Sequence, residues 1–262
     1  MKTIKIFQAD AFTDHLFGGN PAAICLLDQW PDDNLMQSVA AENNLAETAF
    51  LVRKGEGFEI RWFTPVVEVD LCGHATLASG YVIFNHTDYT AGEIVFMSRH
   101  SGELRVRKEG RKLFLDFPAD KFSLCGSLPE IVQCIGRLPA EVYRGKTDFM
   151  AVLGSEEEVR RVQPDFKAIE KLDARGLMIT APGDSVDFVS RFFAPQSGVA
   201  EDPVTGSAHT TLIPYWSGRL GKTTLTARQV SKRGGSLECA YLPPRVIIGG
   251  EAQLYLKGEI YI

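Results

Sequence analysis

Short apolar runs separated by turns dominate the first half of the chain. "TIKIFQADAF" (3–12) alternates apolar and polar residues and predicts a strand, and "LFGGNPAAICLL" (16–27) predicts a turn followed by a second strand. In "PDDNLMQSVAAENN" (31–44) apolar residues recur at helical spacing behind two aspartates, which predicts a helix. The runs that follow, up to residue 118, predict strands joined by glycine-containing or charged turns.

One segment of this half has a different character. "GHATLASGYVIFN" (73–85) is built of small and apolar residues and carries almost no charge, and it predicts a helix. A helix that is apolar on every side is buried. We therefore expect the strands of the first half to surround this helix.

The second half repeats this order. "RWFTP" begins at residue 61 and "RFFAP" at residue 191, a separation of 130 residues (191 − 61), about half of 262. After each, an acidic loop and a glycine lead to a small-residue helix, which in the second half is "GSAHTTLIPYW". Strands near 141–154 and a helix near 155–162, with Ser155 as its cap, precede the second motif.

The sequence thus predicts an α+β fold of two pseudo-symmetric halves, each a mostly antiparallel, barrel-like sheet wrapped around a central buried helix. The N-terminal half spans 1–117 with its central helix near 74–85, and the C-terminal half spans 118–262 with its central helix near 207–217. The boundary falls near 117–120, where "DFPAD" interrupts the strand pattern. The last strand is a candidate for returning to the N-terminal half.

Composition narrows the functional class. The chain is 45% hydrophobic and 23% charged, as in ordinary globular proteins, and its net charge of −5 argues against a nucleic-acid or anionic-membrane partner. Its five cysteines form no CxxC pair, and an odd number fits a reducing compartment. The N-terminus lacks the apolar core of a signal peptide, and no run approaches the ~20 apolar residues of a membrane span. We expect a cytoplasmic protein.

Two motifs with familiar chemistry fail on inspection. "SGRLGKTT" (217–224) resembles a phosphate loop, but Trp216 stands where that loop needs its first glycine, and the segment follows a helix rather than a strand. Ser207 and His209 are two residues apart, as are Cys72 and His74. On a helix such residues point about 200° apart and cannot hydrogen-bond. The sequence therefore favours neither nucleotide binding nor a hydrolase triad.

A metal site is not expected either. Cys72, His74, Asp202 and His209 are the available ligand types near the two glycines, but no pair has the i, i+4 spacing of a helical ligand pair. We expect no metal and no organic cofactor.

The two glycines at the helix starts are more informative. Gly73 in "DLCGHAT" and Gly206 in "EDPVTGSAH" each precede the first turn of an uncharged helix. Free backbone N–H groups there, together with the helix dipole, suit a carboxylate. Simple capping of two helices remains the alternative. In two similar halves, the helix N-termini would each supply one wall of a shared site.

Glu47 is the remaining candidate for chemistry. It lies in "NNLAETAFLV" between apolar residues, with no lysine or arginine within four positions. Apolar surroundings raise the pKa of a carboxyl group, which suits acid/base work near neutrality. The alternative is an exposed glutamate in a loop that enters a strand.

Four motifs in order, "ADAFT…F.GNPAAICLL", "NNLAETAFLV", "RWFTPVVEVDLCGHATLASG" and "RFFAPQSGVAEDPVTGSAH", resemble the phenazine-biosynthesis PhzF-like isomerase family along the whole chain. The resemblance is close to the subgroup of phenazine biosynthesis-like domain-containing proteins. It implies the diaminopimelate epimerase-like fold, with the site between two halves, and a homodimer acting on a small carboxylate without a cofactor.

The resemblance also assigns roles. Glu47 resembles the general acid/base of the family. His74, Asp202 and Ser207 resemble residues that hold the substrate and steer the proton, and the N–H groups of Gly73 and Gly206 would bind a carboxylate. The implied reaction moves a proton along a conjugated system.

Epimerases of this fold use two opposed cysteines, one from each half. Cys72 occupies the first position, but the second falls at Asp202 or Pro203, neither of which is a thiol. One-base isomerisation is therefore the leading hypothesis. The alternatives are an amino-acid racemase or epimerase that uses Glu47 or Cys72, and a non-catalytic binding or scaffold protein.

Overall fold

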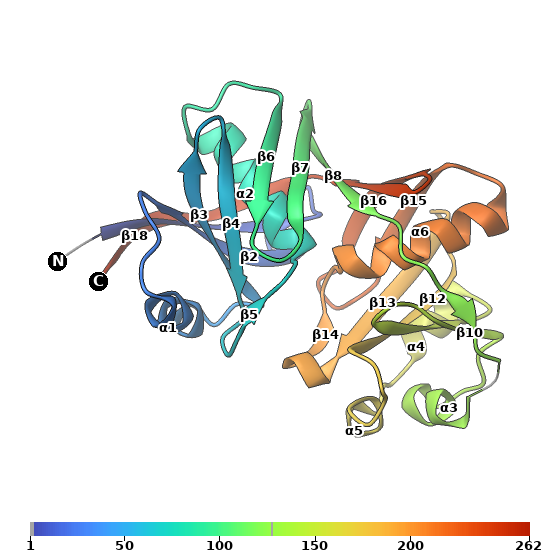
Figure 1. Ribbon diagram of the computed structural model, residues 1–262. Helices are drawn as coiled ribbons and strands as arrows, with labels where there is room; N and C mark the ends of the chain where they lie inside the picture. The colour runs from blue at the N-terminus through green and yellow to red at the C-terminus, as the bar shows by residue number, and fades with distance from the viewer. Residues whose placement is uncertain (1–2, 127) are drawn as a thin grey trace. The chain divides into compact units, whose positions relative to one another are not determined.

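The computed structural model describes residues 3–126 and 128–262, which form two compact units. The first contains the chain up to Asp116 together with Gly249–Ile262, and the second contains Phe117–Ile248. Figure 1 shows the helices and strands of each unit. None of the helices among the described residues is both long enough and apolar enough to cross a membrane.

The first unit is a sheet with two helices. Its strands run in the order β18, β1, β2, β3, β4, β6, β7, β8, and β5 pairs with the end of β4. Among the pairings of the described residues, β2–β3 and β4–β6 are parallel. The elements are β1 (Thr3–Ala11), β2 (Asn20–Leu27), α1 (Asp33–Asn43), β3 (Glu47–Lys54), β4 (Gly57–Phe63), β5 (Glu68–Val69), α2 (Gly73–His86), β6 (Glu93–Ser98), β7 (Gly102–Glu109), β8 (Lys112–Pro118) and β18 (Ala252–Tyr261).

The second unit follows the same plan. Its strands run in the order β9, β10, β11, β12, β13, β15, β16, with β14 paired to β13. In the described part of this unit, β11–β12 and β13–β15 are parallel pairs. Its elements are β9 (Ser123–Leu124), α3 (Pro129–Ile135), β10 (Glu141–Arg144), β11 (Asp148–Val152), α4 (Glu156–Arg161), α5 (Phe166–Ile169), β12 (Gly176–Pro182), β13 (Phe188–Ala194), a 3₁₀ turn (Pro195–Ser197), β14 (Val199–Asp202), α6 (Gly206–Leu220), β15 (Thr224–Gln229), β16 (Gly235–Leu242) and β17 (Arg245–Gly250).

The two units therefore share their strand topology as well as their sequence motifs. In each unit two parallel pairs are joined by crossovers, one of which passes through a short strand and a long helix: β5 and α2 in the first unit, β14 and α6 in the second. The predicted α+β fold with two similar halves is confirmed. The short helices α3 and α5 lie outside the predicted pattern.

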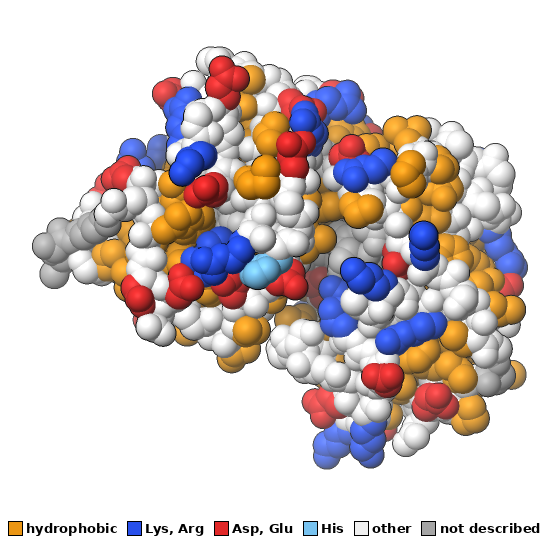
Figure 2. All heavy atoms as spheres, in the orientation of Figure 1, with side chains coloured by type: hydrophobic (Ala, Val, Ile, Leu, Met, Phe, Trp, Pro, Cys, Tyr) orange, Lys and Arg blue, Asp and Glu red, His pale blue; other side chains and the backbone are white. Residues whose placement is uncertain are grey.

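The two central helices are buried, as their lack of charge predicts. Ten residues of α2 are buried, from Gly73 through Gly80 together with Val82 and Ile83. In α6 the large buried side chains include Trp216, whose indole nitrogen donates a hydrogen bond to the Thr180 hydroxyl at 2.9 Å. On the face shown in Figure 2, lysine and arginine side chains are interspersed with aspartate and glutamate side chains.

Candidate active site

Glu47 begins strand β3 and pairs in register with Ala22 of the parallel strand β2. Its side chain is 16% exposed. The next three residues of β3 are buried, so the carboxylate lies at the edge of an apolar layer rather than in open solvent. This position differs from the exposed loop residue that the sequence left open as an alternative.

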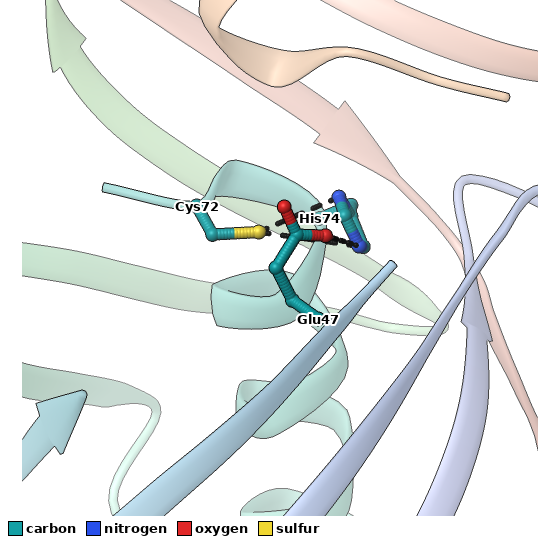
Figure 3. A group of neighbouring side chains, drawn as sticks. All are labelled: Glu47, Cys72 and His74. Carbon is teal, nitrogen blue, oxygen red and sulfur yellow. Dashed lines mark hydrogen bonds and ion pairs between the residues drawn. The ribbon is translucent and has the colours of Figure 1, made fainter. Parts of the chain in front are cut away.

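His74 lies in the first turn of α2 and faces Glu47 (Figure 3). Its Nε2 atom is 3.1 Å from Glu47 Oε2, and its side chain is 5% exposed. On the other side of the ring, the side-chain amide of the buried Asn20 lies 3.1 Å from Nδ1. Each ring nitrogen therefore has a polar neighbour: the Glu47 carboxylate lies beside Nε2, and the Asn20 amide lies beside Nδ1.

Cys72 contacts the same ring, contrary to the prediction from helical spacing. Its Sγ atom lies 3.5 Å from Nδ1 and 3.9 Å from Nε2 of His74. The prediction was wrong because Cys72 precedes the helix: its backbone is extended, with φ −139° and ψ 109°, so the 100° rotation per helical residue does not separate the two side chains.

The charges of this group are coupled. Burial lowers the pKa of His74, but the Cys72 sulfur and the Glu47 carboxylate raise it, and the net pKa lies well above the usual value for histidine. Burial raises the pKa of the Cys72 thiol to about 11, so the thiol is protonated at neutral pH. Glu47 is therefore the anion that favours a protonated imidazole.

The same three residues are the candidates for a metal. The ligand atoms of Glu47, Cys72 and His74 lie within 4.8 Å of one another. A structural zinc site usually has four protein ligands, and this group supplies three among the described residues. The 3.1 Å approach of the Glu47 carboxylate to the His74 imidazole is also compatible with proton transfer.

The N-termini of both central helices lack a side-chain cap. Cys72 precedes α2 and Thr205 precedes α6, and neither side chain accepts a hydrogen bond from the first turn. By contrast, Asp32 caps α1 and Ser155 caps α4 through their side chains. The alternative was that these residues simply cap the two central helices, but the side-chain hydrogen bonds that such caps would make are not formed at either helix start.

In the second unit, Asp202 lies at the end of β14 and is held in a compact turn. Its carboxylate accepts a hydrogen bond from the Thr205 hydroxyl at 2.5 Å. The buried Gln229 spans the turn: its Nε2 donates to the Asp202 carbonyl at 2.7 Å, and its Oε1 accepts from the Thr205 N–H at 2.9 Å. The Gln229 side chain thereby holds the turn that connects β14 to α6.

Ser207 and His209 have different surroundings. The Ser207 hydroxyl accepts a hydrogen bond from Arg175 Nη2 at 3.0 Å. His209 Nδ1 lies 2.8 Å from the Thr205 carbonyl oxygen, to which it donates. Burial lowers the pKa of His209 to about 4, so this histidine is neutral and packs in the interior.

The repeated arginine has the same role in both units. Arg61 forms a two-pronged ion pair with Glu68 of β5, at 2.7 and 2.6 Å, and Arg191 forms one with Glu201 of β14, at 2.7 and 3.0 Å. Both arginines are buried. Each pair ties the strand of the central sheet to the short strand that leads into the central helix. We call these pairs the Arg–Glu clamps.

The predicted site residues thus fall into two groups. Glu47, Gly73 and His74 belong to the first unit, and Asp202, Gly206 and Ser207 to the second. Sequence reasoning missed Asn20, Gln229 and Arg175, together with the Asp148 that binds Arg175. Asn20 stands in the "GGNP" turn, whose Gly-Asn-Pro sequence signals a special backbone but not a contact with a residue 54 positions away.

Comparison with known proteins identifies the family. The family model described as phenazine biosynthesis-like protein matches residues 9–258. An uncharacterized isomerase of Pseudomonas aeruginosa is 52% identical over 98% of both chains. Phenazine biosynthesis-like domain-containing protein 1 of Mus musculus is 40% identical, over 98% of this chain and 99% of that protein. The chain belongs to the phenazine biosynthesis-like (PhzF) family.

Solved structures agree. A PhzF-family protein of Enterococcus faecalis has a TM-score of 0.96 and 48% identity, with all of both chains covered. A predicted epimerase of Pseudomonas aeruginosa, at 19% identity, shares the fold with a TM-score of 0.74 over 99% of both chains. Three curated relatives at 42–52% identity carry the name isomerase, which identifies the chain as an enzyme of that class.

Proposed function

We propose that the protein is a cofactor-independent isomerase of a small carboxylate-bearing substrate, with Glu47 as its single acid/base. One observation carries this proposal. Glu47 Oε2 is buried and lies 3.1 Å from His74, yet no donor in the described part of the chain is aligned to hydrogen-bond it. A buried carboxylate oxygen without an aligned donor retains a lone pair that can accept a proton.

The reaction that suits this group is a proton shift. Glu47 takes a proton from an acidic carbon of the substrate, and the electron pair of the broken C–H bond moves into the adjacent conjugated system. The carboxylic acid then returns the proton to a different carbon, which restores Glu47 and leaves the substrate isomerised. The fixed imidazole beside Glu47 keeps the carboxylate oriented while its charge changes.

Substrate binding would use the uncapped helix starts. Each unit has its own candidate position for a substrate carboxylate: the first-turn N–H groups of α2 at Gly73 in the first unit, and those of α6 at Gly206 in the second, where the Ser207 hydroxyl is a further donor. His74 adjoins the first of these positions and Asp202 precedes the second, and each is proposed to contact a substrate bound at its own helix start.

Two-base racemisation is less well supported. It needs bases on opposite faces of one carbon, whereas Cys72 and Glu47 gather around a single imidazole with their ligand atoms within 4.8 Å. Burial also keeps the Cys72 thiol protonated at neutral pH, with a pKa of about 11. These two residues therefore form one proton-transfer group rather than an opposed pair.

The test is deuterium incorporation from D₂O into a panel of cyclic and amino-acid carboxylates, followed by mass spectrometry and optical rotation. Glu47→Gln should fold normally and lose ~10²–10⁴-fold of the exchange rate, because the amide cannot accept a proton. Cys72→Ser is the matched control and should keep most of the rate.

The outcomes separate the hypotheses. A Glu47→Gln enzyme that keeps a tenth of the wild-type rate would refute the assignment of the base. Equal losses in both variants, with loss of optical rotation, would indicate a racemase. Binding without exchange across the panel would indicate a non-catalytic protein.

A further inference from the structure

An ion pair between a partly exposed arginine, whose side chain is 36% accessible, and a buried aspartate lies beside the start of α6 in the second unit. Arg175 directly precedes β12, and Asp148 begins the parallel strand β11, in register with Gly176. Arg175 Nε donates to Asp148 Oδ1 at 2.9 Å, and Nη2 donates to Asp148 Oδ2. The Asp148 side chain is only 6% exposed, so its charge requires this partner.

The guanidinium is also held on its face. Its central carbon lies 5.2 Å from the centre of the Phe192 ring. Gly176 allows this ring to approach, because a Cβ atom there would lie 2.6 Å from Phe192 Cζ. With Asp148 at its edge and Phe192 at its face, Arg175 has little freedom to turn.

The fixed guanidinium reaches Ser207. Arg175 Nη2 donates to Ser207 Oγ at 3.0 Å. A serine hydroxyl has one proton and two lone pairs, so a donor on one lone pair leaves the proton free to point elsewhere. Because Asp148 balances the charge of Arg175, the main effect of the arginine is exerted through the hydroxyl it contacts.

We infer that Arg175, held by Asp148, is a positioning residue that turns the Ser207 hydroxyl proton toward the carboxylate of the substrate. This inference rests on the proposed role of Ser207 in carboxylate binding and extends it to two residues outside the motifs of the sequence. The role of Arg175 is to orient a donor, not to bind the anion itself.

The experiment is a double-mutant cycle on carboxylate binding. Sodium benzoate is titrated into ¹⁵N-labelled protein, and the amide shifts of residues 206–208 report binding in wild type, Ser207→Ala, Arg175→Lys and the double variant. Ser207→Ala should weaken benzoate binding about tenfold, the usual effect of losing one hydrogen bond to a charged group. Arg175→Lys should weaken it by a similar factor, and the double variant should bind no more weakly than Ser207→Ala alone.

The matched control is Arg160→Lys, which alters another arginine paired with a buried carboxylate, that of Glu156 in α4. It should leave the benzoate affinity unchanged. If Arg175→Lys unfolds the protein, the neutral pair Asp148→Asn with Arg175→Gln replaces it, since no buried charge then remains unpaired.

Three results would overturn the inference. Unchanged affinity in folded Arg175→Lys would show that Ser207 needs no positioning. Additive losses in the double variant would show that Arg175 acts independently of Ser207. No saturable shift at 206–208 in wild type would refute carboxylate binding there, and with it this role, whereas the exchange assay on Glu47 tests proton transfer separately.

Discussion

Replacing Gly80 with alanine would test how closely the central helix of the first unit packs against its sheet. Gly80 lies in the middle of α2, where a Cβ atom would be 2.7 Å from Cγ1 and 3.3 Å from Cβ of Val106 in β7. Val106 is fully buried, and a β-branched side chain has little freedom to move aside. One of the two elements would therefore have to shift.

Two opposing effects determine how much Gly80→Ala changes the free energy of unfolding. Alanine is about 1 kcal/mol more favourable than glycine inside a helix. Overpacking a core costs about 1–3 kcal/mol, and contacts as short as this one place Gly80→Ala in the upper part of that range. The expected net result is a loss of about 1–2 kcal/mol in the free energy of unfolding.

The second central helix supplies the matched control. In α6, a Cβ atom at Gly218 would meet nothing within 4 Å, so Gly218→Ala should gain about 0.5–1 kcal/mol from helix propensity alone. Urea unfolding followed by far-UV circular dichroism measures both variants. Equal stabilisation of both would refute the close packing of α2 on β7. In a Val106→Ala background, Gly80→Ala should lose most of its penalty.

Two further predictions concern charge. NMR titration should show His74 still protonated above pH 6.5 and His209 deprotonating near its pKa of about 4; Glu47→Gln should lower the His74 pKa. Because folding raises the His74 pKa, protonated His74 stabilises the folded state fully below about pH 6.5, and this stabilisation is lost as pH rises through the folded pKa. Glu47→Gln should therefore reduce the loss of stability over that pH range. Arg191→Lys, which breaks a buried clamp, should cost about 2–4 kcal/mol in urea unfolding, whereas Arg161→Lys, in an exposed pair with 73% of the arginine side chain accessible, should cost under about 0.5 kcal/mol. Equal effects of these two substitutions would show that the clamp contributes no more than a surface pair.

The local sequence pattern was sufficient to predict the two central helices and the repeat of the two units. The uncharged runs after Gly73 and Gly206 predicted two buried helices, and the spacing of "RWFTP" and "RFFAP" predicted two similar units. These features depend on residues close together in sequence, where periodicity and turn chemistry act directly. The short helices α3 and α5 have only 7 and 4 residues, too few for a clear helical period.

The contacts between residues of the candidate site could not be predicted from the local sequence pattern. Asn20 meets His74 across 54 positions, and Arg175 meets Ser207 across 32, and no local period relates residues so far apart. The contact between Cys72 and His74 was missed for a different reason, since it depends on where the helix begins. Residue type and family motif could nominate side chains, but only the fold shows which of them touch.

The return of β18 to the first unit bears on the order in which the chain folds during synthesis. β1 (Thr3–Ala11) pairs along its length with β18 (Ala252–Tyr261), from Thr3 opposite Tyr261 to Ala11 opposite Ala252. Everything in the second unit is translated between these partners. The unit that leaves the ribosome first is therefore the one completed last. Until the final strand arrives, one edge of β1 lacks its partner and is open to wrong pairing, whereas the second unit can fold as soon as its own strands have emerged.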